Sequence, residues 1–377
     1  MACSAKRTED AFNPLTNQAM RYPYDTSYRD SQSLLRYPGT RITYGVLALV
    51  LLIAPWILPS YFVGEITFVF IMCVVSLGLM VLVGYTGQVS LGHAAFVAIG
   101  AYSHAWLLAQ GVPLVASLAL AACITGAIGF VIGLPAIRVS GLYLAMVTLA
   151  FAILAEIVAG SWESVTGGYT GMPVESANLF GLDLSGPRGF YHLCLAVLLV
   201  VLLGLINLMR SKTGRAFIGV RDSEAAAYSL GIWVNGYKVL AFVISAAITG
   251  LGGALVAHQT GYLTPEGFGL ILSLELVLMV TIGGLGSLRG AILGAILISM
   301  LPVFISRIKP MLPDAIAKQF GLEIFVFGLV LALFVLFEPK GINGRWIKLK
   351  AFLENFPIYR KNMFKRGKSY MKSERYK

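Results

Sequence analysis

The chain has 377 residues, of which 57% are hydrophobic and only 12% are charged, with a formal net charge of +11. A soluble domain carries about 25% charged residues, so this composition excludes an ordinary soluble protein of this length. Lipid can solvate an apolar surface, and membrane-spanning chains satisfy their backbone internally, so we predict a membrane protein of the all-α class. The 41 glycines agree with this class, because glycine lets membrane helices pack closely.

The two ends of the chain are polar, unlike its middle. Residues 1–41 carry ten charges and no apolar run, so we expect a cytoplasmic arm and not a signal peptide. Residues 339–377 form a basic tail that holds 12 of the 29 lysines and arginines. We expect this tail to face anionic lipid head groups and to fix the topology, rather than to bind nucleic acid.

Between these ends, residues 42–338 form the predicted membrane domain. A bilayer core needs about 20 apolar residues per helix, and about ten segments qualify. They lie near residues 42–59, 65–83, 89–109, 113–134, 141–160, 190–209, 238–258, 270–285, 290–306 and 319–337. Polar residues interrupt the third, and the eighth and ninth are short and joined by a glycine-rich link. Whether these three helices are continuous or broken stays open.

The basic residues test this topology independently. With both chain ends in the cytoplasm, ten spans place 25 Lys and Arg inside and four outside. Cytoplasmic loops carry such an excess of basic residues. The same map makes 161–189 an extracytoplasmic loop and 210–238 a cytoplasmic loop. Because the outer loop is long and rich in Gly and Pro, we expect it to form structured cover at the outer mouth.

Small residues recur at intervals of four along two of the predicted helices. This spacing places them on one helix face, and such stripes are contact surfaces between membrane helices. The first stripe comprises Ser245, Thr249, Gly253 and Ala257, and the second comprises Gly286, Gly290 and Gly294.

Two glycine-rich segments echo one another. GYTGQVSLG (84–92) and GGLGSLRG (283–290) share glycines three apart followed by Ser-Leu. Two related five-helix halves, as in many transporters, would explain the echo. Chance similarity in glycine-rich apolar sequence explains it equally well.

No motif for catalysis or nucleotide binding is present. The one Gly-Lys-Ser, at 367–369, has Asn362 where a P-loop requires its first glycine. No HExxH, GxSxG or paired-cysteine site occurs, and the four cysteines lie far apart. We therefore predict a protein that is not an enzyme, binds no metal or other cofactor and has no ATPase of its own.

Polar residues inside apolar segments are costly, which makes them candidates for a solute path. We predict a path lined by Gln88, Ser90, His93, Tyr143 and Thr148. For His93 and for Glu275 a purely structural role stays open, since a polar group packed inside a bundle leaves the same pattern.

The loop 210–238 is too long for a simple connector. Its stretch RDSEAAAYSLG has helical composition, with Arg221 and Asp222 at the start, Glu224 in the first turn and Gly231 as the C-terminal stop. A short exposed helix on the inner face could transmit force from a soluble partner. A solvated amphipathic turn is the alternative.

This loop resembles the EAA coupling loop of bacterial ATP-binding-cassette (ABC) importers. Together with GYTGQVSLGHAAFVAIGAY (84–102), residues 214–236 resemble LivM-type permeases of the branched-chain amino-acid uptake family. The stretches 141–156, 166–172 and 281–295 are also similar, and the resemblance runs from about Thr43 to Gly341. In one departure from the general pattern, Gly231 follows Glu224 by seven residues instead of six.

The resemblance implies a multi-pass permease subunit that carries branched-chain amino acids across the bacterial inner membrane. It implies a second related permease, a periplasmic solute-binding protein and two cytoplasmic ATPases that hydrolyse ATP. The residues that would contact the ATPases are Arg221, Asp222, Glu224, Ala225, Ala226, Ala227 and Gly231. Import of urea, short amides or aromatic acids, a self-contained ion-coupled carrier and a structural membrane subunit are the alternatives.

Overall fold

The computed structural model describes residues 38–175, 178–179, 182–183 and 186–308, and 325, 328–329, 332–333, 336, 341–346 and 349 beyond them. The chain divides into two compact units, Gly45–Arg345 and a second that joins Met1–Tyr44 to Trp346–Lys377. Nearly all of the second unit, with the predicted arm and tail, lies outside the described residues. The fold is therefore that of Gly45–Arg345.

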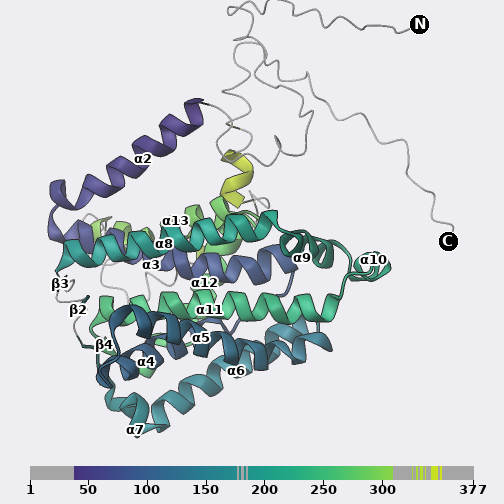
Figure 1. Ribbon diagram of the computed structural model, residues 1–377, viewed down its shortest axis with the longest axis horizontal. Coiled ribbons are helices and arrows are strands. Elements are labelled where there is room, and N and C mark those ends of the chain that lie inside the picture. Colours follow the sequence, from purple (N-terminus) through teal and green to yellow (C-terminus); the bar gives the residue numbers. More distant parts are fainter. Residues whose placement is uncertain are drawn as a thin grey trace, which may run out of the picture. The chain divides into compact units, whose positions relative to one another are not determined.

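Helices make up most of this unit (Figure 1). The long ones are α2 (Pro38–Ile57), α3 (Ser60–Leu79), α4 (His93–Ala109), α5 (Leu114–Gly133), α6 (Leu142–Ser161), α8 (Pro187–Arg210), α9 (Lys212–Asp222), α11 (Val234–Thr260), α12 (Leu270–Gly283) and α13 (Leu288–Ile308). The short ones are η1 (Met80–Tyr85), η2 (Pro135–Ile137), α7 (Glu163–Thr166), η3 (Gly168–Thr170), α10 (Glu224–Ser229) and η4 (Pro265–Phe268).

Seven helices in the described part of the chain are long and apolar enough to cross a membrane. They are Ser60–Tyr85, Leu114–Gly133, Leu142–Ser161, Pro187–Arg210, Val234–Thr260, Pro265–Gly283 and Leu288–Arg307. These seven match seven of the ten predicted segments, so the polytopic helical class is confirmed and the number ten is not. The first predicted segment forms the shorter apolar helix Ile42–Ile57, and most of the last, 319–337, lies outside the described residues.

The third predicted segment, 89–109, is not one continuous span. The π-helical turn η1 and Thr86 end the α3 helix, residues 87–92 follow without regular helix, and only then does α4 begin at His93. Ser90 accepts from the backbone NH of Gly92 and so competes with helical hydrogen bonding. Gly87, with φ of +71°, takes a left-handed conformation that ends the preceding helix. The remaining helix has 17 residues, and 13 of them are buried.

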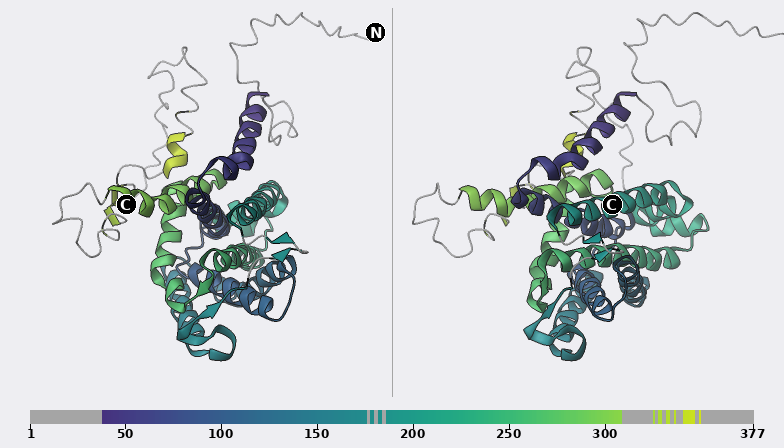
Figure 2. Two further views of the ribbon diagram at one scale, coloured as in Figure 1. Left: turned by 90° about the vertical axis from the view of Figure 1, so that its left-hand side faces the viewer. Right: turned by 60° about the vertical axis from the view of Figure 1, so that its left-hand side comes forward.

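Helix α11 lies in the middle of the bundle and packs most extensively against α5, α4 and α3 (Figures 1 and 2). In the helix formed by α3 and η1, 89% of the most apolar window is buried, against 28% in α6 and in α8. Helices α3, α4 and α11 therefore form the interior, and α6 and α8 leave most of their apolar surface exposed.

Close approach of the interior helices depends on glycine. A Cβ on Gly253 would lie 2.1 Å from the carbonyl oxygen of Val97 on α4, and one on Gly100 would lie 2.1 Å from that of Gly250. Ser245, Thr249 and Ala257 are as fully buried as their neighbours on this face. The first stripe of small residues thus lies where α11 meets its neighbours.

The second stripe needs a correction. Gly290 and Gly294 lie on α13 and pack against the backbone of α12, where Cβ atoms would meet the carbonyl oxygens of Gly283 and Met279. Gly286, however, precedes α13, in the turn after α12, with φ of +78°. The prediction that Gly286 shares a helix face with Gly290 is wrong, because α13 starts only at Leu288.

Short strands connect the loops at the end of the bundle away from α10. Strand β1 (Met172–Pro173) pairs antiparallel with β4 (Tyr262–Leu263), and β2 (Asn178–Leu179) pairs with β3 (Leu182–Asp183). The β1–β4 pair joins the loop after α6 to the turn after α11. Thr166 stabilises that loop by donating its hydroxyl to the carbonyl oxygens of Ala159 and Trp162.

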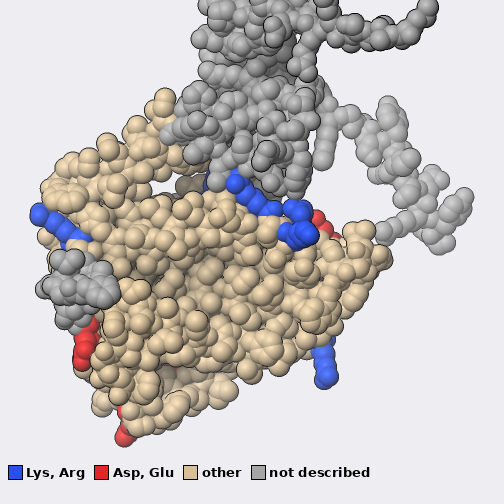
Figure 3. All heavy atoms as spheres, viewed as in Figure 1, with Lys and Arg blue, Asp and Glu red and all other residues tan. Residues whose placement is uncertain are grey.

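Charged side chains are scarce on the surface of the bundle. In Figure 3 they lie at the margins of the visible face, and the broad middle carries none. A surface without charges along the sides of the helices is what a lipid bilayer requires.

Candidate translocation and coupling site

A polar segment, residues 86–93, crosses the interior of the bundle between η1 and α4. Thr86, Gln88, Ser90 and His93 all have side chains that are at most 5% exposed. Buried polar groups are costly unless hydrogen-bonded, so their partners show what the segment is built to hold.

His93 lies in a directional chain of hydrogen bonds. The hydroxyl of Ser245 donates to the carbonyl oxygen of Gly78 (2.7 Å), so it can accept from His93 Nε2 (2.8 Å). His93 Nδ1 is then free to accept from the hydroxyl of Ser90 (2.9 Å). A neutral imidazole protonated at Nε2 satisfies every step of this chain. His93 therefore joins the polar segment to α11 and α3.

Thr148 of α6 holds the same segment from the other side. Its hydroxyl accepts from the backbone NH of Leu91 (3.0 Å) and donates to the carbonyl oxygen of Ala145 (3.0 Å). The structure thus brings Ser90, His93 and Thr148 into one neighbourhood. Tyr143, in the first turn of α6, is 73% exposed and takes no part in these hydrogen bonds.

Gln88 binds the first turn of α11. Its Nε2 donates to the hydroxyl of Thr86 (3.2 Å) and to the backbone carbonyl of Lys238 (3.4 Å). The hydroxyl of Thr86 donates its own proton to the carbonyl oxygen of Leu82. Thr86 Oγ1 and the Lys238 carbonyl therefore both act as acceptors, so the NH2 group of the Gln88 amide must face them. The other amide atom, Oε1, is buried without a hydrogen-bond partner among the described residues.

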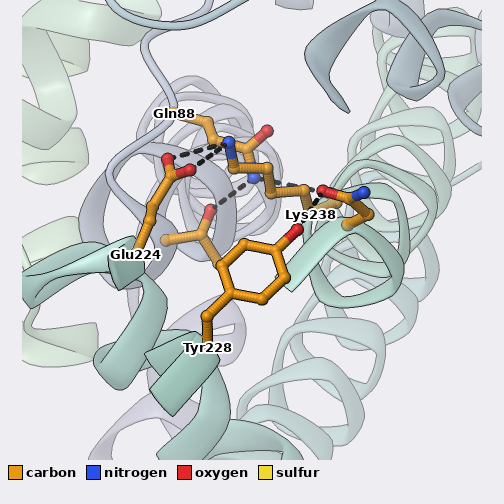
Figure 4. A network of polar contacts seen from close by, with 6 residues as sticks. Gln88, Glu224, Tyr228 and Lys238 are labelled. Carbon is orange, nitrogen blue, oxygen red and sulfur yellow. Dashed lines mark hydrogen bonds and ion pairs between the residues drawn. The ribbon is translucent and has the colours of Figure 1, made fainter. Parts of the chain in front are cut away.

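Lys238 and Glu224 form an ion pair at the same place (Figure 4). The ammonium nitrogen of Lys238 lies 2.8 Å from each carboxylate oxygen of Glu224. The side chain of Lys238 is only 5% exposed, whereas that of Glu224 is 48% exposed. Lys238 is not among the predicted site residues, although a lone lysine at the start of an apolar helix is a visible signal in the sequence.

The loop before α11 contains two helices instead of one. Helix α9 is capped by Ser211 and ends at Asp222, and Ser223 caps α10 by accepting from the backbone NH of Ala226. Arg221 and Asp222 therefore end one helix and do not start the next, which corrects the prediction. The two caps explain the break, since serine side chains satisfy the first free NH groups of a helix. Gly231 has φ of +76° just after α10, where a stop was predicted.

Helix α10 and the turn that follows it, as far as Trp233, present an apolar surface to solvent. Leu230 is 80% exposed, Trp233 73% and Tyr228 53%, and Ala225 and Ala226 are exposed beside them. Ala227 points the other way and packs in a small cluster with Val220 and Val234. Exposed apolar side chains that are held in place by a packed base are typical of a protein-binding surface.

Arg221 binds where the two echoing segments meet. Its Nη1 donates to the carbonyl oxygen of Gly84 (3.1 Å), and Nε and Nη2 both donate to Asp222 (3.0 Å). A Cβ on Gly286 would lie 2.7 Å from the same Nη1, and one on Gly84 would lie 2.8 Å from the backbone nitrogen of Gly286. The segments 84–92 and 283–290 are therefore neighbours, in contact with the end of α9.

A pair of histidines, one buried and one half-buried, was missed altogether. Nε2 of His104 on α4 lies 2.9 Å from Nε2 of His258 on α11, close to the other end of both helices. The residues are 154 apart in the chain, and no local pattern signals the pairing.

Comparison with known proteins identifies the family. The sequence model described as "Branched-chain amino acid transport system / permease component" matches residues 61–336. The chain is 36% identical to the high-affinity branched-chain amino acid transport system permease protein LivM of Escherichia coli, over 67% of this chain and 66% of that protein. It is 35% identical to LivM of Salmonella typhimurium, over 65% and 63%.

The alignments thus span slightly less than two thirds of these two relatives. A shorter stretch, 30% of this chain, is 35% identical to 34% of the autoinducer 2 import system permease protein LsrC of an Enterobacter species. No solved structure matched the chain. The family is one of transport components and not of enzymes. With its family model covering residues 61–336 and its polytopic helical fold, the chain belongs to the permease components of branched-chain amino acid transport systems.

Proposed function

We propose that this chain is the solute-translocating subunit of an ABC importer for branched-chain amino acids in the bacterial inner membrane. The family match over residues 61–336 carries the proposal, and the names of the most similar relatives supply the solute. The energy would come from two cytoplasmic ATPases. A second related permease would complete the membrane part, and an extracytoplasmic binding protein would deliver the solute.

Charge distribution supports the orientation that this function needs. At the α10 end of the bundle lie Arg138, Arg210, Lys212, Arg215, Arg221, Lys238 and Arg289, whereas Arg188 and Arg307 lie near the other end. Basic residues gather on the cytoplasmic side of membrane proteins. The α10 end would therefore face the cytoplasm, where ATPases are found.

Reconstitution tests the solute and the class together. The complete complex in proteoliposomes, with ATP inside the compartment that holds the ATPases, is expected to take up leucine, isoleucine and valine. Urea, acetamide and benzoate, which differ chemically from these amino acids, are tested in competition with them. The reason is that LsrC, a relative over part of the chain, is named for a different solute. Uptake by this chain alone, driven by an ion gradient, would overturn the proposal in favour of a secondary carrier.

The exposed face of α10 is our candidate for ATPase docking. Leu230→Ser removes an apolar side chain that is 80% exposed, so the fold should be unaffected while the ATPases no longer co-purify. Leu285→Ser is the matched control, because Leu285 is also exposed (56%) but lies in the turn before α13. Equal retention of the ATPases by both variants would contradict docking at α10.

We further propose that the polar segment, with Gln88, Ser90, His93 and Thr148, borders the solute path, and that Tyr143 lies at its inner mouth. The concentration of polar groups in an apolar bundle supports this. Because Ser90 is fully buried, Ser90→Cys should react with a small thiol reagent during turnover and not at rest. Tyr143→Cys should react in both states. The background needs Cys123 replaced by serine, since that cysteine is exposed.

A further inference from the structure

The ion pair between Glu224 and Lys238 joins two elements of different character. Glu224 is the first residue of α10, a short helix with an exposed apolar face. Lys238 lies in the first turns of α11, the helix at the centre of the bundle. Both carboxylate oxygens contact the ammonium group, so the pair also fixes the orientation of α10 (Figure 4).

Among the described residues, the positive charge of Lys238 is compensated by Glu224 alone. Its side chain is 5% exposed, and Glu224 is the one acidic partner that it has among the described residues. A buried charge that loses its partner is strongly destabilising. The lysine and the glutamate must therefore stay together when either helix moves.

The backbone at Lys238 is attached to the polar segment. Gln88 donates to the carbonyl oxygen of Lys238, and seven residues further along α11 Ser245 accepts from His93. Residues seven apart lie on the same face of a helix, two turns from one another. One face of α11 thus holds both Gln88 and His93, at two points of the polar segment.

A second attachment leads from the same loop to the start of that segment. Arg221, three residues before Glu224, donates to the carbonyl oxygen of Gly84 and packs against Gly87. Displacement of the α9–α10 connection would therefore act at the start of the polar segment, through Arg221 at Gly84 and Gly87, and through Lys238 at Gln88. Gln88 Oε1 is buried and has no hydrogen-bond partner among the described residues. A second conformation of the segment could supply that partner.

We propose that Lys238 is a positioning residue that couples α10 to the polar segment, so that movement of α10 imposed by an ATPase opens and closes the solute path. The proposal rests on the proposed function, since it gives α10 an ATPase to follow. Lys238 touches neither solute nor nucleotide. Its effect passes through Glu224 on one side and through Gln88 and α11 on the other.

The test uses the reconstituted full complex and measures the number of leucine molecules imported per ATP hydrolysed. Lys238→Met and Glu224→Gln are each expected to lower this ratio at least tenfold while the ATPases remain bound. The double variant Glu224→Gln/Lys238→Met contains no unpaired buried charge, so it should accumulate like the parent and still be uncoupled. Lys212→Met, an exposed lysine on α9, is the control and should keep the parental ratio.

Charge reversal and a conservative change complete the design. Glu224→Lys/Lys238→Glu should regain part of the ratio that each reversal alone removes, and Lys238→Arg should keep most of it. If the neutral double variant imports leucine with the parental ratio, Lys238 is only structural and the proposal is wrong. The parent complex is measured first: a parent that imports no branched-chain amino acid contradicts the proposed function instead, whatever the variants do.

Discussion

At Gly253 the interior helices α11 and α4 approach so closely that no side chain fits. The Cβ of alanine would lie 2.1 Å from a backbone oxygen, which cannot rotate away as a side chain would. Gly253→Ala should therefore force the helices apart and cost about 1–3 kcal/mol of stability, even though alanine favours helix. The measurement is the melting temperature of the detergent-solubilised protein.

Gly204→Ala provides the matched control for this prediction. Gly204 lies on the exposed side of α8 with no atom within 4 Å of its Cβ position. There alanine should leave the melting temperature unchanged or raise it, since it only improves helix propensity. Equal losses at both positions would show that close packing is not the reason why Gly253 is glycine.

Gly231 depends on backbone conformation and not on space. Its φ is +76°, and a Cβ would meet no atom within 4 Å, so only the left-handed conformation disfavours other residues. Gly231→Val should cost about 1–2 kcal/mol locally and reduce leucine-stimulated ATP hydrolysis, because the chain after α10 would be redirected.

Gly231→Asn should retain most of that hydrolysis, since asparagine tolerates the left-handed region. Gly219→Ala, inside α9 with ordinary contact to Ile232 at 3.5 Å, should behave like the parent. Parental hydrolysis by Gly231→Val would exclude a role for this turn and leave Ala225 to Ala227 as the next positions to examine.

At the scale of the element, α10 is too short to be stable alone and depends on its base. A six-residue helix lies far below the length at which isolated helices form, and Ala227 anchors it between Val220 and Val234. Ala227→Asp would bury a carboxylate in this cluster at a cost of several kcal/mol, or about the whole of the local stability.

The measurement for this prediction is amide hydrogen exchange in residues 223–233. Ala227→Asp should abolish protection there while α11 and α3 keep theirs. Ala226→Asp, one residue earlier and exposed, should keep α10 protected. If both variants exchange like the parent, the small cluster does not hold the helix.

Element positions were predicted well where a long apolar run ends at proline or glycine. Pro59, Pro113 and Pro187 lie at the starts of α3, α5 and α8, and Gly261 ends α11. The predictions were wrong where side chains compete with the backbone. Ser223 splits the expected helix at 221–231 into two. For the segment 89–109, whose continuity the sequence left open, residues 87–92 form a break before α4.

At the scale of the whole molecule, the distribution of basic residues predicts the orientation in the membrane. The excess of basic residues at the α10 end predicts that this end is cytoplasmic. A reporter active only in the cytoplasm should be active when fused after Lys212 or Lys350 and silent when fused at Gly168. Activity at Gly168 would reverse the topology from α6 onward.

The amino-acid sequence by itself determined that the helices lie in lipid, that the fold is all-α, and which family the chain resembles. Scarcity of charge requires lipid around the helices, the length of each apolar run defines a span, and the loop at 210–238 was recognisable as a candidate coupling element. The two related five-helix halves stay a prediction, and Gly84 and Gly286 of the echoing segments are in contact.

Only the tertiary structure decided which polar groups meet. His93 and Ser245 are 152 residues apart, and Gln88 and Lys238 are 150 apart. Periodicity in a sequence tells which face of a helix is buried, because burial is a property of each residue. It does not tell which other face that surface meets, because the pairing depends on how all helices pack at once. The ion pair between Glu224 and Lys238, and the attachment of the polar segment to α11, follow from that packing alone.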